Sequence, residues 1–175
     1  MGIIICGMNG SGKSTLGRAL AEKLCWRFID NEDLYFPKND PDYLYVGQRP
    51  QEEVERLLLE AVRADDRFVF AAVKGDYGEA VLPYYGRAVL VEVPRETRLQ
   101  RVKQRSLDKF GDRALPGGDL YEREKWFFDH VSARPEDYAV RWLNSLDIPV
   151  LRVDGTRPVG ENVAAIMAWM GEVRR

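Results

Sequence analysis

The chain has 175 residues, a formal net charge of −2, 45% hydrophobic residues and 31% charged residues. This length fits one domain with a substantial core, and we expect a single domain over residues 1–175. A net charge so close to zero excludes a global basic field that recruits nucleic acid, so we expect no nucleic-acid partner. The opening apolar run GIIICG is too short for a signal peptide or a membrane span, so we expect no membrane association.

The chain has two cysteines, Cys6 and Cys25. Both fall in predicted buried elements and show no spacing typical of metal ligands, so we interpret them as free core thiols in a reducing compartment. Together with the lack of a long apolar run, this usage predicts a cytoplasmic protein.

Short β-rich runs alternate with helical patterns along the chain. Strands are predicted at residues 3–6, 27–29, 68–73, 88–93 and 148–153. Their near-continuous apolar character is typical of strands covered on both faces, as in a parallel sheet. Apolar residues with helical spacing occur at residues 16–24, 54–62, 139–146 and 159–170. The order β-α-β-α-β-α-β-α-α-β-α predicts an α/β fold.

Between the first strand and the first helix lies GMNGSGKST, residues 7–15. It satisfies the P-loop pattern G-x-x-x-x-G-K-[ST] in the required strand–loop–helix context. Glycines let backbone N–H groups curl around a phosphate, and the helix N-terminus adds positive potential. We expect Lys13 to reach the β- and γ-phosphates and the Ser14 hydroxyl to ligate Mg²⁺. The predicted nucleotide-binding residues here are Gly7, Asn9, Gly10, Ser11, Gly12, Lys13, Ser14 and Thr15.

Basic side chains follow the fourth predicted strand. Arg98, Arg101 and Arg105 are spaced i, i+3, i+7, which places them on one face of a helix. Guanidinium groups grip phosphate oxygens bidentately, although most such stripes are simply solvated faces. The Gly/Pro-rich stretch GDRALPGGD (residues 111–119) follows and is typical of a mobile loop, and Arg134 lies beyond the next helical pattern.

Several segments resemble the small P-loop kinases, the group that contains shikimate kinase, gluconate kinase and adenylate kinase. FIDNED resembles the strand-end Phe-x-Asp-x-Asp of shikimate kinase, and VGQRPQEEVERLLLE resembles the arginine-bearing start of the following helix. RETRLQRVKQR resembles the arginine-rich helix before the lid, and VDGTRPVGENVAAI resembles the last strand and the adenine-contacting loop. The chain departs from the pattern at Glu32, which replaces the second Asp, and at VKGDYGE, which replaces a glycine-rich turn.

The resemblance implies a five-stranded parallel sheet in the order 2-3-1-4-5, flanked by helices and carrying a lid segment at residues 106–134. It also implies a kinase that transfers the γ-phosphoryl group of Mg·ATP to a hydroxyl of a small-molecule acceptor, with ATP and Mg²⁺ as cofactors. Residues 31–64 would bind the acceptor.

The stretch RFIDNEDLYF places three carboxylates after the second strand. Ligands of such sheets bind outside the carboxyl ends of the strands, so this cluster should face the P-loop. We assign Asp30 to the metal, and Glu32 or Asp33 to the acceptor hydroxyl. Asp33 has an equally plain interpretation as a residue that caps or solvates the loop.

Further roles follow from the resemblance and from the positions of basic side chains after the strands. Arg49 is expected to clamp an anionic group of the substrate, and Lys74, after the third strand, either contacts the substrate or belongs to a simple turn. Arg101 or Arg105 is expected to reach an ATP phosphate; Arg134 is a weaker candidate for that role and is also expected to bind the substrate. Arg157 falls in the adenine-contacting loop. The catalytic set is thus Lys13, Asp30, Glu32, Arg101 and Arg105.

Two other functions remain open at this point. One is a nucleoside or nucleoside-monophosphate kinase, in which Arg49 would hold the phosphate or sugar of the acceptor. The other is a non-catalytic ATP-sensing module that switches a partner. The sequence leaves the acceptor and the oligomeric state open.

Overall fold

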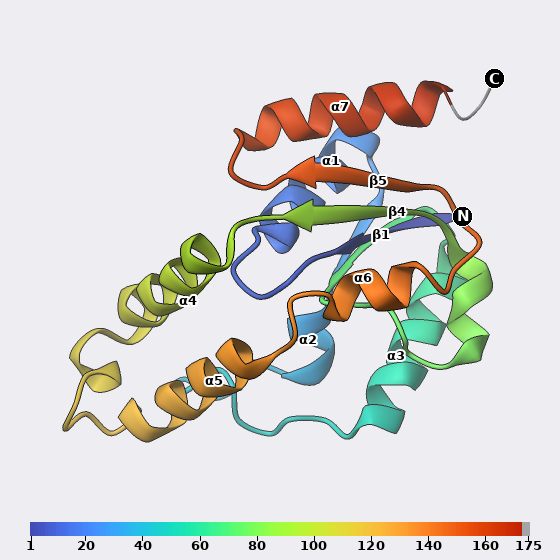
Figure 1. Cartoon of the computed structure of the whole chain (residues 1–175). Helices are drawn as coiled ribbons and strands as arrows, with labels where there is room; N and C mark the ends of the chain where they lie inside the picture. Colours follow the sequence, from blue (N-terminus) through green and yellow to red (C-terminus); the bar gives the residue numbers. More distant parts are fainter. Residues whose placement is uncertain (173–175) are drawn as a thin grey trace.

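A computed structural model describes residues 1–172 of the chain. Five parallel strands form one sheet in the order β2-β3-β1-β4-β5, which confirms the predicted fold class and strand order (Figure 1). The strands are β1 (Gly2–Cys6), β2 (Arg27–Asp30), β3 (Phe68–Ala72), β4 (Tyr85–Glu92) and β5 (Val150–Asp154).

Helices connect the strands and cover both faces of the sheet. The α-helices are α1 (Lys13–Leu24), α2 (Asn31–Tyr35), α3 (Gln51–Ala64), α4 (Arg95–Phe110), α5 (Tyr121–Ala133), α6 (Tyr138–Leu143) and α7 (Val159–Glu172). Two short 3₁₀ helices, η1 (Glu79–Tyr84) and η2 (Gly111–Ala114), complete the described elements.

The core lies on both faces of the central strand β1, all of whose residues are buried. Ile3 and Ile5 pack with apolar side chains of α1 and α7, whereas Ile4 and Cys6 pack with those of α3 and α6 on the other face. Successive side chains of a strand point to opposite faces. Because both faces of β1 are covered, an uninterrupted apolar run is what this strand requires.

The connections differ from the prediction in three places. The segment between β3 and β4 is the 3₁₀ helix η1 rather than an α-helix, and it contains Pro83, which lacks the N–H that an α-helix needs. Three α-helices, not two, separate β4 from β5. The short helix α2 begins directly after β2 because Asp30 caps it, its side chain accepting a hydrogen bond from the Glu32 amide.

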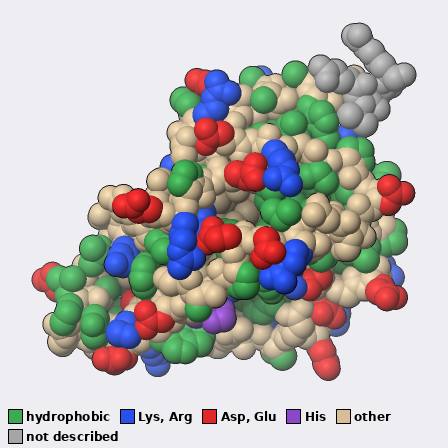
Figure 2. Space-filling model, in the orientation of Figure 1, with side chains coloured by type: hydrophobic (Ala, Val, Ile, Leu, Met, Phe, Trp, Pro, Cys, Tyr) green, Lys and Arg blue, Asp and Glu red, His purple; other side chains and the backbone are tan. Residues whose placement is uncertain are grey.

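One of the two cysteine predictions is wrong. Cys6 is buried, but Cys25 is exposed because it follows the last residue of α1 in a left-handed conformation, with φ of 54°. Among the residues described here, no helix combines the length and the apolar character needed to cross a membrane. On the face shown in Figure 2, acidic and basic side chains lie next to one another rather than in a patch of one sign.

The carboxyl ends of the strands point toward α4, and α4 and α5 extend away from the sheet beyond those ends (Figure 1). The P-loop and the end of β2 lie at the same edge. The fold therefore places the predicted phosphate-binding loop, the strand-end carboxylates and the projecting helices around one region.

Candidate active site

The P-loop forms a cradle of backbone N–H groups before α1. Gly10 and Gly12 have positive φ angles of 80° and 88°, a conformation that other residues rarely adopt. A Cβ atom on Gly10 would also lie 2.3 Å from the carbonyl oxygen of Arg98. Within residues 1–172 the buried Ser11 hydroxyl has no hydrogen-bond partner, and no side chain caps α1. Unpaired donors at a helix N-terminus fit a bound phosphate.

Lys13 lies between acids and other bases in this cradle. Burial, reinforced by Arg105 and Arg134, lowers the pKa of Lys13 to about 8, although Asp30 and Glu32 act in the opposite direction. The loss of hydration disfavours the charged ammonium when the site holds no anion. Phosphate oxygens would supply the missing counter-charge, so the lysine is suited to bind a polyanion.

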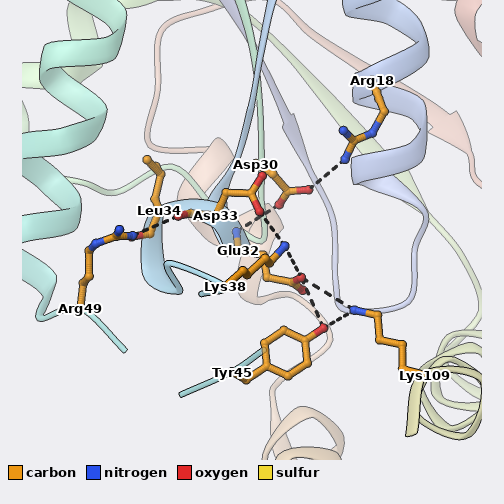
Figure 3. A network of polar contacts seen from close by, with 9 residues as sticks. All are labelled: Arg18, Asp30, Glu32, Asp33, Leu34, Lys38, Tyr45, Arg49 and Lys109. Carbon is orange, nitrogen blue, oxygen red and sulfur yellow. Dashed lines mark hydrogen bonds and ion pairs between the residues drawn. The ribbon is translucent and has the colours of Figure 1, made fainter. Parts of the chain in front are cut away.

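Asp30 and Glu32 lie at the end of β2 and are held differently. The Asp30 Oδ1 atom accepts from the Glu32 amide at 3.1 Å, and its Oδ2 atom lies 3.9 Å from Arg18 Nη2. The Glu32 carboxylate lies 2.9 Å from Lys38 Nζ and accepts a hydrogen bond from the Tyr45 hydroxyl at 3.3 Å (Figure 3). Burial alone would raise the pKa of Glu32, but the hydrogen bond and charge of Lys38 lower it, so this group remains a carboxylate.

Asp33 is separated from these two acids. Its carboxylate is exposed and forms an ion pair with Lys38 at 2.6 Å (Figure 3). Asp33 does not line the cavity described below, whereas Asp30 and Glu32 do. Of the two acids that the sequence offers for the acceptor hydroxyl, the geometry therefore favours Glu32.

Two cavities flank the P-loop. The first, of about 560 Å³, contains Lys13, Ser14, Asp30 and Glu32 together with side chains of α4 and α5. The second, of about 480 Å³, is lined by Ser11, Gly12 and Thr15, by residues of the β5–α7 loop, and by Arg101 and Arg157. A P-loop with a cavity on each side has room for two ligands that meet at the phosphate.

The arginines of α4 divide between these cavities. Arg105 lines the first cavity, whereas Arg101 lines the second and donates to the carbonyl oxygen of Gly155 at 3.2 Å. Arg98 is 2% exposed, and its Nη2 atom donates to both carboxylate oxygens of Glu136, at 2.6 and 2.8 Å. The stripe is therefore one structural arginine followed by two arginines that face different cavities.

Arg134 and Arg157 also lie next to the P-loop region. Arg134 Nη1 donates to the Asn9 side-chain oxygen at 2.6 Å. Arg157 lines the second cavity and forms an ion pair with Glu161 at 3.1 Å. The fold thus brings both of them to the expected side of the molecule.

Arg49 and Lys74 lie outside both cavities. Arg49 donates to the carbonyl oxygens of Leu34 and Asp33, at 2.8 and 3.1 Å, on the opposite side of the strand-end carboxylates from Lys109 (Figure 3). Lys74 pairs with Asp76 at 2.6 Å. In this arrangement Arg49 braces α2, and Lys74 closes the turn after β3.

Several residues that line the first cavity were not predicted from the sequence. Lys109 follows Arg105 by four residues and therefore lies on the same helix face, so helical spacing gives a signal for it. Ser106 of α4 donates a hydrogen bond to Glu124 of α5 at 2.8 Å. Nothing in the spacing of those two residues reveals that the chain folds back to bring them together.

Known proteins are similar to this chain in sequence and in fold. Residues 3–114 match the AAA domain family. A shikimate kinase from Gloeobacter violaceus is 33% identical over 129 residues, covering 69% of this chain and 71% of that protein. The "Uncharacterized protein YqaC" of Bacillus subtilis is 25% identical over 176 residues, covering 96% of each chain.

Solved structures show the same architecture. A shikimate kinase from Aquifex aeolicus aligns with a TM-score of 0.55 and 20% identity, covering 99% of this chain and 98% of that chain. A deoxyadenosine kinase from M. mycoides with bound dATP aligns with a TM-score of 0.59 and 15% identity, covering 98% of this chain and all of the other, 100%.

The fold and the P-loop define a P-loop protein, and its kinase relatives make it a phosphotransferase. The chain belongs to the AAA domain family and, within the P-loop proteins, to the small-molecule kinases.

Proposed function

We propose that the protein transfers the γ-phosphoryl group of Mg·ATP to a hydroxyl group of a small-molecule acceptor, as a shikimate kinase-like enzyme. One observation carries this proposal: Lys13 and Ser14 of the P-loop share a cavity with Asp30, Glu32 and Arg105. Phosphoryl transfer requires a metal site, cations on the migrating group and an aligned hydroxyl, and this cavity offers a group for each.

The proposed nucleotide site is the P-loop and the second cavity. ATP phosphates would lie against the backbone N–H groups of residues 7–15, and the adenosine part would lie toward Arg101 and Arg157. The chemistry of the P-loop also fits Mg²⁺, which typically takes one or two protein oxygens beside substrate phosphates and water. Ser14 and Asp30 would supply these oxygens, and the metal would neutralise phosphate charge.

In the transfer step, the acceptor hydroxyl oxygen bonds to the γ-phosphorus while the bond from phosphorus to the ADP oxygen breaks. The hydroxyl proton passes to the Glu32 carboxylate, which also orients the hydroxyl. Lys13 and Arg105 stabilise the negative charge on the migrating group. Residues 106–134 act as a lid that excludes water, since hydrolysis competes with transfer.

Residues 31–64 form the acceptor side in this proposal, with Glu32 as its contact at the reacting hydroxyl. Arg134, which is held near the P-loop by Asn9, is suited to the phosphates of either substrate. Roles for Arg49, Asp33 and Lys74 in acceptor binding remain predictions. They require these side chains to leave the partners that they have in this structure.

ADP release from Mg·ATP, measured against a panel of hydroxy acids, nucleosides and nucleoside monophosphates, tests the proposal. We expect one acceptor class to raise ADP release well above the rate with ATP alone. Lys13→Ala provides the blank, since it removes the cation at the phosphates. If ATP binds but no acceptor, including those in a cell extract, raises ADP release, the proposal is wrong.

A further inference from the structure

One wall of the first cavity is made of aromatic rings. Phe36, Tyr43, Tyr45 and Phe110 line it and form one aromatic wall. The ring centroids of Phe36 and Tyr45 are 5.4 Å apart, those of Tyr43 and Tyr45 5.5 Å, and those of Tyr43 and Phe110 5.3 Å. A wall of contacting rings offers a broad apolar surface on which a flat ring can stack.

The wall joins two parts of the chain that are distant in sequence. Three of its rings come from the segment after α2, and Phe110 is the last residue of α4. The helix α5 adds Trp126, which lines the same cavity yet is 68% exposed and stacks on His130 with a centroid distance of 5.5 Å. A large exposed aromatic side chain at a cavity rim is a feature that a bound ligand ring would cover.

Next to the aromatic wall lies a nearly buried carboxylate. Glu124 is 9% exposed and lines the cavity. Within residues 1–172 its hydrogen-bond partners are two hydroxyl groups: Tyr43 donates at 2.7 Å and Ser106 at 2.8 Å. Burial and the neighbouring carboxylate raise the pKa of Tyr43, so Tyr43 stays a donor.

The Glu124 carboxylate can accept more hydrogen bonds than these two. An ionised carboxylate offers about four sites for hydrogen-bond donors, and leaving a buried charge with few partners is unfavourable. Glu124 is therefore prepared to accept hydrogen bonds from N–H groups of a ligand in the cavity.

The charges in this part of the cavity disfavour an anionic acceptor. Glu32 and Glu124 both face it. Lys109 forms an ion pair with Glu32 at 4.0 Å and donates a hydrogen bond to the Tyr45 hydroxyl. Arg49, the clamp expected for an anionic group, is engaged by backbone carbonyls outside the cavity. A carboxylate on the acceptor would thus meet two acids, while of the other arginines that line the cavity Arg105 lies beside Lys13 and Arg123 packs over the Tyr43 ring at 5.4 Å.

From these observations we propose that the acceptor is a nucleoside: an uncharged compound whose flat heteroaromatic ring stacks on the aromatic wall, whose ring N–H groups donate to Glu124, and whose hydroxyl reaches Glu32. This inference rests on the proposed function for the transfer step, but nucleoside binding to the cavity can be measured without it.

The test has two readouts on the full-length protein. Calorimetry measures binding of the common ribo- and deoxyribonucleosides, and of shikimate and gluconate, in the presence of a non-hydrolysable ATP analogue. ADP release with Mg·ATP measures turnover of the same compounds. We expect at least one nucleoside to bind and to be phosphorylated, and the two hydroxy acids to do neither.

Glu124→Gln then tests the recognition itself. It keeps the size of the side chain but removes the charge that ring N–H groups meet, so the KM for the nucleoside should rise by about tenfold or more while kcat changes little. Asp129→Asn is the matched control, since Asp129 is an exposed carboxylate on the same helix, paired with Lys125 at 2.6 Å. Nucleoside binding by calorimetry and the thermal unfolding midpoint distinguish lost recognition from a misfolded variant.

The outcomes separate this inference from the proposed function. If a hydroxy acid is phosphorylated and no nucleoside binds, the inference is overturned and the proposed function stands. If a nucleoside binds in a Glu124-dependent manner but neither the panel nor a cell extract raises ADP release, the nucleoside site stands and the proposed function fails. Absence of nucleoside binding overturns the inference whatever the turnover, as does a Glu124→Gln variant that binds nucleosides as tightly as the parent.

Discussion

At the scale of single residues, the environment of Lys13 suits the site to an anionic ligand. Burial removes the water that would favour the charged form of this side chain, and the neighbouring acids do not compensate for that loss. The pKa of Lys13 therefore falls to about 8. An anion that binds there must favour the charged form and raise this pKa again.

This difference predicts a pH dependence of ATP binding. Below pH 8 the free protein already carries the charged lysine. Above pH 8 the free lysine loses its proton while the bound one keeps it, so binding must take up a proton and weakens. We expect the Kd for a non-hydrolysable ATP analogue to rise by about tenfold between pH 7 and pH 9, measured by calorimetry. The Lys13→Ala variant should bind weakly with a much flatter profile; an equal slope in both proteins would contradict the assignment.

A second prediction at this scale separates Glu32 from Asp33. The two acids are neighbours in sequence, but only Glu32 lines the cavity. A positioned base contributes about 10²–10⁴-fold to rate, so Glu32→Gln should lower kcat by about 100-fold or more. Asp33→Asn, at an exposed ion pair, should change kcat by less than about threefold. Steady-state kinetics with the identified acceptor decide this, and the reverse ranking would show that Asp33 serves the hydroxyl.

At the scale of elements, α4 links the P-loop to both cavities. Its first turns are fixed by Arg98, which donates to the Val93 carbonyl oxygen at 3.2 Å and to Glu136. Its later turns carry Arg101 and Arg105, which one turn of helix separates. The first turns of α4 therefore fix the helix in place, and its later turns carry side chains into the two cavities.

The positions of these two arginines predict different kinetic effects. Arg101, in the second cavity, should act mainly on nucleotide binding, so Arg101→Ala should raise the KM for ATP more than it lowers kcat. Arg105, beside Lys13 in the first cavity, should act on the migrating group, so Arg105→Ala should lower kcat by about 10²-fold. Arg141→Ala is a suitable control, because Arg141 is an exposed residue of α6 paired with Asp137 at 3.1 Å. Identical kinetic changes in the Arg101→Ala and Arg105→Ala variants would contradict these separate roles.

The projecting helices also hold the segment that follows α2. Arg113 Nη1 donates to the Asp42 carbonyl oxygen at 2.9 Å, Lys109 donates to Tyr45, and Tyr43 donates to Glu124. The proposed lid and the proposed acceptor segment are thus in direct contact, and the first cavity is enclosed between them and the sheet.

At the scale of the molecule, the strands, the α/β fold class and the P-loop were predicted because their signals are local, whereas the strand order was implied by the resemblance to the small P-loop kinases. The apolar run of β1 and the glycines of residues 7–15 each identify their structure within a few positions. The acceptor half of the cavity has no such signal. Tyr43 and Glu124 are 81 positions apart, and their hydrogen bond exists only once α5 folds back along α4.

The same reasoning explains why the expectation for Arg49 differs from the observed arrangement. Its position before α3 matches the kinase pattern, but the short helix α2 presents free carbonyl oxygens to it. The sequence pattern places an arginine near the acceptor segment, whereas local packing determines the direction of its side chain.

The fate of the γ-phosphoryl group tests the central claim most directly. The protein would be incubated with Mg²⁺, ATP labelled at the γ-phosphate, and the acceptor panel, and the label would be followed into organic phosphate, inorganic phosphate or unreacted ATP. We predict that the label moves to an organic acceptor in the parent protein and stays in ATP with Lys13→Ala. Label that appears only as inorganic phosphate, or remains in tightly bound ATP whatever the acceptor, would contradict phosphoryl transfer and favour a nucleotide-sensing module.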